Sequence, residues 1–235
     1  MAQNAGNARN ILVGASPLFL SSTDSTDTAN YVDNAEPGST AAAAFVSGTS
    51  YTTTLNGVTS GTFYYRNVGY TNNGLQITYN PTYGSVTVDQ LLDTAKLFKE
   101  SMEVMIATEM AEGTLENVLT VFGQGSSTLT TESGFTAGTV NKTKTLGLAA
   151  GALGIAPTER QLIAVGQAPT TTDGDNSKTT ERVYYARRVL SVQQSQFSLA
   201  RNNPTTFPVT FRLLPSGDSA YAGQEYGKII DRILA

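Results

Sequence analysis

The chain has 235 residues and a formal net charge of −4, with 40% hydrophobic residues and only 14% charged ones. This length allows one large β domain or two small ones, and the hydrophobic fraction is sufficient for a core. The absence of cysteine and histidine excludes disulfides and thiol chemistry, and it removes the usual general base and the commonest metal ligand. The negative net charge argues against nucleic-acid binding driven by phosphate contacts.

The surface must be polar without being strongly charged, because an ordinary soluble domain has roughly 25% charged residues. Such surfaces are common in proteins that pack against copies of themselves, although a Thr-rich β protein would have the same composition. The charges are also divided unequally. Residues 10–122 carry three Lys/Arg and eleven Asp/Glu, whereas residues 123–235 carry eleven Lys/Arg and eight Asp/Glu. Sorting these halves onto different faces would make the protein electrostatically self-complementary; a mixed surface is the alternative.

The N-terminal quarter is poor in regular patterns. Residues 1–10 are small and polar and predict an arm, while residues 11–13 and 18–20 predict one broken strand. Pro17 interrupts this apolar run and only Arg9 precedes it, so we do not interpret it as a signal peptide. Residues 16–62 contain 18 Ser/Thr and no Lys or Arg, which indicates a loop region with a short strand at 51–55. No apolar run approaches the roughly 20 residues that a membrane helix needs.

Residues 63–123 carry the clearest local patterning. Residues 64–70 predict a strand, and Asn73-Gly74 predicts a tight hairpin turn before a second strand that alternates at Leu75, Ile77 and Tyr79. A third strand follows at residues 85–89. Residues 101–106 alternate again and predict a fourth strand, although propensity alone also permits a helix over residues 91–105.

A change of period then predicts a short helix. Four apolar side chains fall at i, i+3, i+4 and i+7 and form one stripe facing the sheet, with Asn117 outside it. Gly113 with Glu116 is expected to cap the start of this helix, and Gly123 its end in the left-handed conformation. The stripe consists of Leu115, Val118, Leu119 and Phe122.

The second half reads as strands with long loops. Residues 124–143 form a loop-rich stretch, and strands are predicted at residues 146–155, 161–165, 182–192, 207–213 and 226–234. At least eight strands at short spacing and one helix indicate a mainly β fold, a sandwich or barrel with one flanking short α-helix. We expect a single domain over residues 1–235.

No constellation for catalysis is present. A nucleophilic serine needs a base within reach; histidine is absent, and no Ser-x-x-Lys occurs. There is no phosphate-binding loop either. Glu100 and Glu103 could act as paired carboxylates, but a spacing of three on a strand puts them on opposite faces. We therefore expect no enzyme activity, no catalytic residue, no cofactor and no metal site.

A family resemblance rests on several of these segments. The run Val68-Gly69-Tyr70-Thr71 through Pro81, the sequel Val86 to Gln90 and the helix start Thr114–Asn117 resemble the tail tube proteins of long-tailed (siphophage-type) bacteriophages. The end of the chain, Phe207 to Leu214 followed by Gly217, resembles the end of the same family. The resemblance covers about half of the chain and consists of strands and turns.

This resemblance implies a structural virion protein. Members of the family form hexameric rings in which each subunit lends strands to a continuous β-barrel, and the rings stack into the phage tail tube through which DNA is ejected. The implied partners are other copies of the chain and the tape-measure, tail-terminator and tail-tip proteins; DNA passes through the lumen without specific binding, and no membrane is involved. The implied location is the virion tail, assembled in the host bacterial cytoplasm.

The alternatives are the tube protein of a contractile secretion system and a β-sandwich module that binds carbohydrate or a receptor. For the tube, an acidic or neutral lumen would let phosphates slide, whereas Lys or Arg would hold them. Candidates for lumen carboxylates are Asp89, Glu100 and Glu103. The same residues could instead form salt bridges between subunits, and the sequence leaves both roles open.

Overall fold

The computed structural model describes residue 14 and residues 16–21, 50–52, 62–91, 93–135, 140–151, 153–154, 157–169, 179–193, 195–199, 201–202 and 204–234. This part of the chain is mainly β, with one large antiparallel sheet, one two-stranded sheet and one short α-helix. The large sheet contains β1 (Leu18–Ser21), β2 (Ser50–Thr52), β3 (Thr62–Asn67), β4 (Thr71–Thr87), β5 (Thr94–Met110), β8 (Arg160–Gln167), β9 (Thr179–Ser191), β10 (Phe207–Leu213) and β11 (Gly227–Leu234). The small sheet pairs β6 (Leu129–Thr131) with β7 (Lys144–Leu146), and the helix is α1 (Leu115–Val121).

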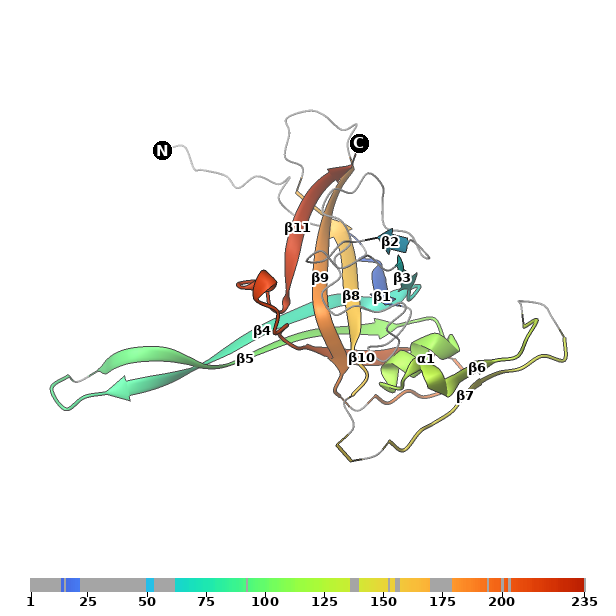
Figure 1. Cartoon of the computed structure of the whole chain (residues 1–235), viewed down its shortest axis with the longest axis horizontal. Coiled ribbons are helices and arrows are strands. Elements are labelled where there is room, and N and C mark those ends of the chain that lie inside the picture. Colours follow the sequence, from blue (N-terminus) through green and yellow to red (C-terminus); the bar gives the residue numbers. More distant parts are fainter. Residues whose placement is uncertain are drawn as a thin grey trace.

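The large sheet branches at β9. Its strand order is β2-β3-β1-β8-β9-β10-β5-β4, and β11 also pairs with β9. Residues 189–191 of β9 pair with β10, whereas residues 179–186 pair with β11. The two partners therefore pair with different segments of β9. In Figure 1, β8, β9 and β11 run upward while β10, β5 and β4 run across them.

The main core lies between the two halves of the sheet. It combines residues of β1, β8 and β9 with residues of β5 and β10, and α1 contributes Val121. A second cluster occupies the other face of β1, β8 and β9. The fully or nearly fully buried members of the main core include Leu18, Leu20, Ile106, Met110, Leu162, Val189, Val209 and Phe211.

Several predicted strands are confirmed. The structure has strands over residues 18–21, 160–167, 179–191, 207–213 and 227–234, each within a few residues of its predicted position. The segment at residues 51–55 forms only the three-residue β2, as far as it is described. The predicted N-terminal arm, the strand at residues 11–13 and most of the Ser/Thr-rich stretch lie outside the described residues.

The predicted hairpin at Asn73-Gly74 is wrong. β3 pairs with β1 and β2 rather than with β4. Asn73 and Gly74 do adopt positive φ, at 60° and 67°, but they form an irregularity inside β4 where the register shifts between Asn72 and Gln76. Left-handed residues serve a bulge as well as a turn, so the dipeptide alone does not distinguish them. The long hairpin is β4–β5, and it merges two predicted strands into one.

The structure also decides the predictions for residues 91–105 and 146–155. The helix permitted over residues 91–105 does not form, because β5 pairs with β4 along almost its whole length and this pairing overrides propensity. The strand predicted over residues 146–155 is wrong in the described part of that range, because β7 ends at Leu146 and residues 147–151 and 153–154 form no strand. Gly151 and Gly154 have φ of 69° and 84°, which a strand does not accommodate.

The start of the predicted helix is also corrected. Thr114, not Gly113, is the N-cap, and its side chain accepts a hydrogen bond from the backbone N–H of Asn117. Gly123 has a φ of 63°, which confirms the left-handed residue at the C-terminal end. In the described part of the chain the strands do not close a barrel, because β4 and β2 end the strand order.

Candidate functional site

The β4–β5 hairpin extends well beyond the body of the molecule. We call residues 81–91 and 93–102 the arm; Figure 1 shows it projecting away from every other strand. The eight β5 residues from 94 to 101 are all exposed, whereas β5 alternates with buried residues from Met102 onward. At about 3.3 Å per residue, this exposed segment is about 26 Å long. The chain therefore keeps a long two-stranded ribbon in solvent.

One face of this hairpin is apolar from the core to the arm. Ile77 lies opposite Ile106 and Tyr79 opposite Val104, and Ile106 and Val104 are buried in the main core. Because side chains on one face recur every second residue, the same face continues outward along the arm. Tyr79 is 65% exposed and Leu97 is 63% exposed. The apolar members of this face are Ile77, Tyr79, Pro81, Tyr83, Leu97 and Met102. Lys99 lies on the same face opposite Tyr83, with its ammonium 5.7 Å from the centroid of the Tyr79 ring.

The opposite face of the hairpin is polar but nearly uncharged. It is built from amide and hydroxyl side chains of β4 and β5, and Thr210 and Arg212 of β10 extend it. Its carboxylate Glu103 lies 3.7 Å from Arg212, so the two charges largely compensate. The polar hairpin members of this face are Gln76, Thr78, Asn80, Thr82, Ser101 and Glu103. Ala107 and Met105 lie among them, opposite Gln76 and Thr78.

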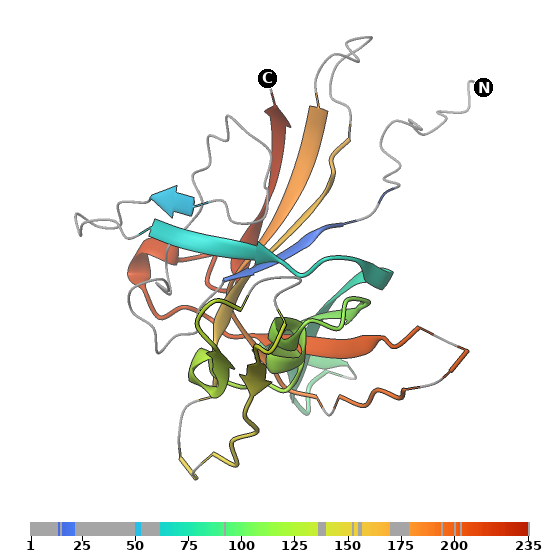
Figure 2. The same ribbon diagram turned by 90° about the vertical axis from the view of Figure 1, so that its right-hand side faces the viewer.

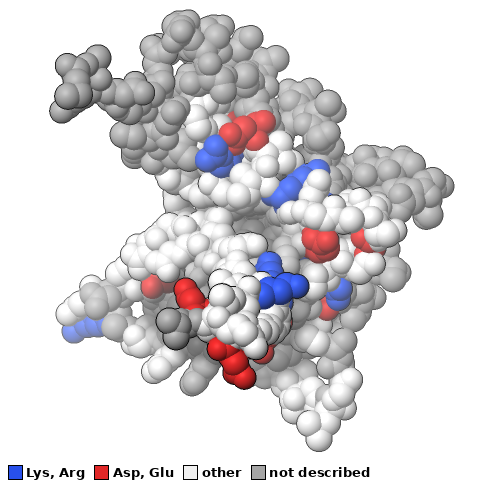
Figure 3. Space-filling model, turned by 90° about the vertical axis from the view of Figure 1, so that its left-hand side faces the viewer, with Lys and Arg blue, Asp and Glu red and all other residues white. Residues whose placement is uncertain are grey.

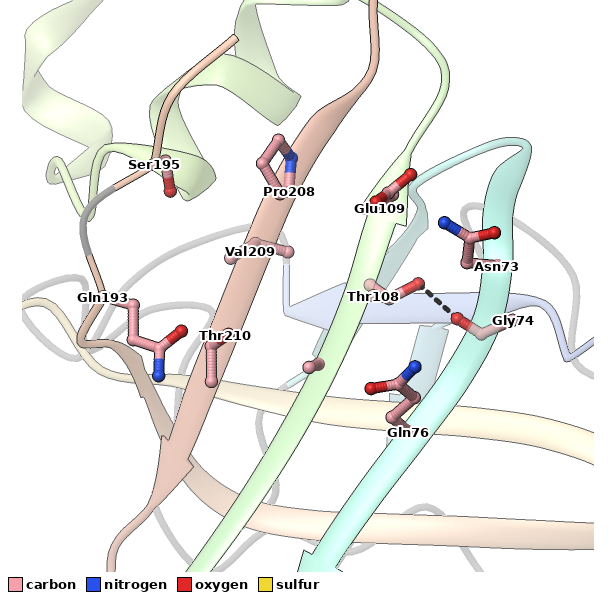
Figure 4. A pocket seen from close by; sticks show the side chains of 11 residues that line it. Asn73, Gly74, Gln76, Thr108, Glu109, Gln193, Ser195, Pro208, Val209 and Thr210 are labelled. Carbon is pink, nitrogen blue, oxygen red and sulfur yellow. Dashed lines mark hydrogen bonds between the residues drawn. The ribbon is translucent and has the colours of Figure 1, made fainter.

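A polar pocket of about 370 Å³ lies at the base of the polar face. Figure 4 shows its side chains, which come from β4, β5, β10 and the segment after β9. The Thr108 hydroxyl donates a hydrogen bond of 2.9 Å to the carbonyl of Gly74 across its floor. Glu109 is the one charged residue in its lining, and no aromatic side chain lines it. The pocket can hydrogen-bond to polar groups but offers no nucleophile–base pair.

An apolar groove of about 240 Å³ lies on the other side of the hairpin. Its walls are the base of the apolar face, with Ile77 and Tyr79, and the facing strands β9 and β11, with Tyr184 and Ile229. Tyr184 and Ile229 are directly paired, and Ile229 is 64% exposed. Lys228 is the one charged residue in the lining. We refer to this feature as the groove.

β11 is fixed to β9 by a charged pair as well as by the strand ladder. The Nε and Nη2 atoms of the Arg182 guanidinium donate hydrogen bonds of 2.6 and 2.7 Å to the carboxylate of Asp231. Hydrogen bonds from Arg182 lower the pKa of Asp231 below its ordinary value, and those to Asp231 raise the pKa of Arg182. The groove wall at Ile229 is thus held in place.

The root of the hairpin is closed by one buried side chain of α1. Asn117 has no exposed surface, and its amide donates to the carbonyls of Val68 and Glu112 at 2.8 and 2.9 Å. Val68 precedes β4 and Glu112 follows β5, so one amide ties together the two chain segments that enter and leave the hairpin. Its oxygen accepts a hydrogen bond of 2.7 Å from Arg66 of β3.

Glu112 closes the same root from the side. Its carboxylate accepts from the backbone N–H of Tyr70 at 3.0 Å, and the N–H of Ala111 donates to the carbonyl of Tyr70 at 2.8 Å. The carboxyl group sits where a Cβ of residue 69 would lie, within 2.0 Å of it. Gly69 also has a φ of 86°, so a larger residue would be strained there and would displace this carboxylate as well.

Charges around α1 shift two pKa values. Burial lowers the pKa of Arg66, while the nearby Glu116 and Glu112 oppose that effect. Burial by itself would raise the pKa of Glu116, but the hydrogen bond and charge of Lys144, with Arg66, lower it below its ordinary value. Lys144 belongs to β7 and donates to the Glu116 carboxylate, so this ion pair fixes the small sheet to the helix.

The three candidate lumen carboxylates are not brought together. Asp89 lies in the exposed turn at the tip of the arm, and Glu103 lies on the polar face near the body. Glu100 is the extra residue of a bulge in β5, where Thr82 pairs with Ser101 and Tyr83 with Lys99. The bulge changes the alternation on which the prediction of opposite faces for Glu100 and Glu103 rested.

The predicted helix stripe is displaced toward Asn117. Leu119 is buried and Val118 packs against the core, whereas Leu115 is half-buried. Phe122 is 37% exposed and stacks on Phe197 at 6.1 Å between ring centroids. The placement of Asn117 outside the stripe is wrong, because a buried hydrogen-bonding asparagine cannot be distinguished from a surface one by periodicity. Sequence reasoning also missed Tyr184 and Ile229, which meet the hairpin only through the folding of the sheet.

The described residues offer no cluster of metal ligands. No three His, Cys, Asp or Glu side chains among them gather closely enough to hold a metal ion. Figure 3 shows the side from which the arm projects, where positive and negative side chains are few and interspersed. No helix in the described ranges is long and apolar enough to cross a membrane. No protein-family model and no curated protein matches this chain.

Replacement of Asn117 by alanine should destabilise the protein by about 2–4 kcal/mol, because several buried partners lose a hydrogen bond at once. Replacement of Leu119 by alanine should cost about 2–5 kcal/mol through the cavity it leaves. The Phe122→Ala variant is the matched control and should cost clearly less than Leu119→Ala. Urea denaturation of the three variants measures this order; an Asn117→Ala variant as stable as wild type would show that the root does not depend on the amide.

The Glu116–Lys144 pair should give a pH-dependent contribution to stability. Because the folded pKa of Glu116 is lowered, the contribution is complete above the ordinary glutamate pKa of about 4.3 and is lost as pH falls through the folded value. The Glu116→Gln variant should therefore melt below wild type at pH 7, with the gap closing below about pH 4. Lys144→Met should show the same profile in thermal melts. A gap that is constant with pH would refute this assignment.

Proposed function

We propose that this chain is a structural virion protein that polymerises as stacked hexameric rings into a phage tail tube, the conduit for DNA ejection. The observation that supports this most is the two-faced β4–β5 hairpin. Its apolar face leaves the core and continues into solvent, and its other face is polar with compensated charges. A ribbon of this kind gains stability when its apolar face is covered and its polar face stays wet.

The free strand edges support assembly with further copies. Among the described strands, β4 has no partner on its outer edge and β11 pairs only with β9. Unpaired edges with exposed apolar side chains are an aggregation hazard in a monomer, and a ring of subunits uses them up. In the proposed tube, hairpins of neighbouring subunits lie side by side and complete the barrel that one chain leaves open.

The polar face suits the wall of a DNA channel. Thr, Ser, Asn and Gln side chains present dipoles without fixed positive charge, and Arg212 is offset by Glu103. Duplex DNA would meet few cations to hold its phosphates and would slide. We assign Glu103 to the lumen on this basis, and Asp89 at the exposed tip to a contact with a neighbouring subunit. Tape-measure, tail-terminator and tail-tip proteins are the further partners of such a tube.

The two alternatives differ in what they explain. A tube protein of a contractile secretion system would use the same hairpin in the same way, and its channel would carry protein in place of DNA. A carbohydrate-binding module would leave the exposed arm without a purpose, and the polar pocket lacks the aromatic ring on which a sugar usually stacks. The first alternative therefore fits the described surfaces better than the second.

Purified protein should form rings or hollow tubes as its concentration rises, because each subunit carries both exposed edges. Negative-stain electron microscopy and sedimentation velocity check this together. Isolated globules in micrographs, with a monomer in sedimentation at high concentration, would refute the proposed function.

Glu103→Lys should leave tubes intact but make them retain DNA. Each subunit would then present a Lys beside Arg212 to the lumen. These cations should bind DNA phosphates at low salt. The measurement is co-sedimentation of a short labelled duplex with preformed tubes, with Glu103→Gln as the neutral control.

Asp89→Lys should instead weaken assembly, because it reverses the charge at a contact between subunits. If Glu103→Lys alone abolishes assembly while Glu103→Gln assembles, Glu103 belongs to an interface and not to the lumen.

A further inference from the structure

The arm and the groove are two exposed apolar surfaces of matching chemistry. The arm presents Leu97 at 63% exposure and Phe98 at 47%, and the groove presents Tyr184 and Ile229. The arm also carries Lys96, Lys99 and Glu100, and Lys228 lines the groove. Exposed apolar surface of this extent on a single chain marks an interaction site.

The far end of the arm carries large apolar side chains on both faces. Tyr83 and Leu97 extend the apolar face, while Val86 and Phe98 lie on the opposite side, where the Phe98 ring covers Gly84. Each face also carries a lysine, because Lys99 lies opposite Tyr83 and Lys96 opposite Val86. The arm can therefore make apolar contacts with a partner on either face.

The arm cannot fill the groove of its own chain. Ile77 and Tyr79 form one wall of the groove, and the arm begins directly after them and leads away from it. Figure 1 shows the arm leaving the body on the side opposite α1 and the small sheet, and in Figure 2 α1 and the small sheet face the viewer. The occupant must therefore be another molecule.

The backbone of the groove wall offers a strand edge of the same length as the arm. β11 has eight residues, and the fully exposed segment of β5 has eight, residues 94–101. Among the described strands, β10 pairs with β5 only over residues 105–110 and β11 pairs only with β9, so the arm segment and β11 each have one open edge. Two open edges of equal length can form a ladder of main-chain hydrogen bonds while their side chains fill the groove.

The acidic tip of the arm is complementary to the lysine of the groove, whereas Lys96 and Lys99 within the arm have the same charge as that lysine. The tip of the arm carries Asp89 and Asp93, and its nearest cation along the chain is Lys96. The charged residue in the groove is Lys228. An acidic tip approaching a wall with a lysine is attracted, whereas two acidic tips repel each other.

We infer that the arm of one copy seats in the groove of the next, with β5 residues 94–101 added to the edge of β11 and Leu97 packed against Ile229. This inference rests on the self-assembly in the proposed function and specifies its contact. The arm and the groove are different surfaces, so the contact is head-to-tail. Such a contact closes into a ring or propagates as a filament, and it does not stop at a dimer.

Disulfide trapping in the full chain tests this contact, since the natural sequence has no cysteine. The double variant Leu97→Cys/Ile229→Cys, oxidised mildly at assembling concentration, should give a ladder of covalent dimers, trimers and larger species on a non-reducing gel. Each single variant has one thiol and can give at most a dimer. The matched control is Leu97→Cys/Thr78→Cys, in which Thr78 lies exposed on the polar face; it should give no ladder.

The outcomes separate this inference from the proposed function. Tubes or rings without a ladder would overturn the arm–groove contact and leave the tube intact. A ladder without tubes or rings would support the contact and overturn the tube. Monomers without a ladder would overturn both. A ladder of equal yield in the Thr78 control would overturn the contact, because collisions would then explain the cross-links. As a second measurement, Ile229→Asp should reduce the assembled fraction at least tenfold while its thermal melt stays cooperative.

Discussion

The buried amide of Asn117 is the interaction on which the hairpin depends. It reaches from α1 to the carbonyl before β4 and to the carbonyl after β5, and it accepts from Arg66 of a third strand. A long ribbon in solvent has few contacts of its own, so its direction is set at its root. A satisfied buried polar network fixes one geometry more sharply than apolar packing would, because each partner left without a hydrogen bond costs free energy. The rigid root makes the arm a defined surface.

That defined surface has an unusual distribution of polarity. The apolar face of the hairpin does not end where the core ends but continues along the arm, while the opposite face is mainly polar as far as Thr82 and carries Val86 and Phe98 beyond it. Within a single chain this arrangement gives up apolar burial that a shorter hairpin would keep. It becomes favourable once a neighbour covers the exposed face. The same physical argument therefore underlies the proposed tube and the proposed arm–groove contact: in both proposals, a neighbouring subunit covers apolar surface that one chain leaves exposed.

The low charge of the chain is consistent with the proposed packing against identical copies. Surfaces that pack against identical copies in a ring avoid large charges of one sign, because each would be repeated next to its copy. The described face around the arm accordingly shows few and interspersed charges (Figure 3). The ion pairs that do occur near the root and groove, Glu116 with Lys144 and Arg182 with Asp231, join elements within one chain.

The sequence by itself determined the fold class, most strand positions and the presence of the helix, because alternation and the 3.6-residue period are local properties. It did not determine which strands pair. Asn73-Gly74 supplied positive φ to a bulge and not to a turn, and β3 joined β1 across a long separation in the chain. Only the tertiary structure placed Asn117 inside and brought Tyr184 and Ile229 against the base of the hairpin. Burial and strand neighbours arise from contacts between distant segments, and a local period contains no information about them.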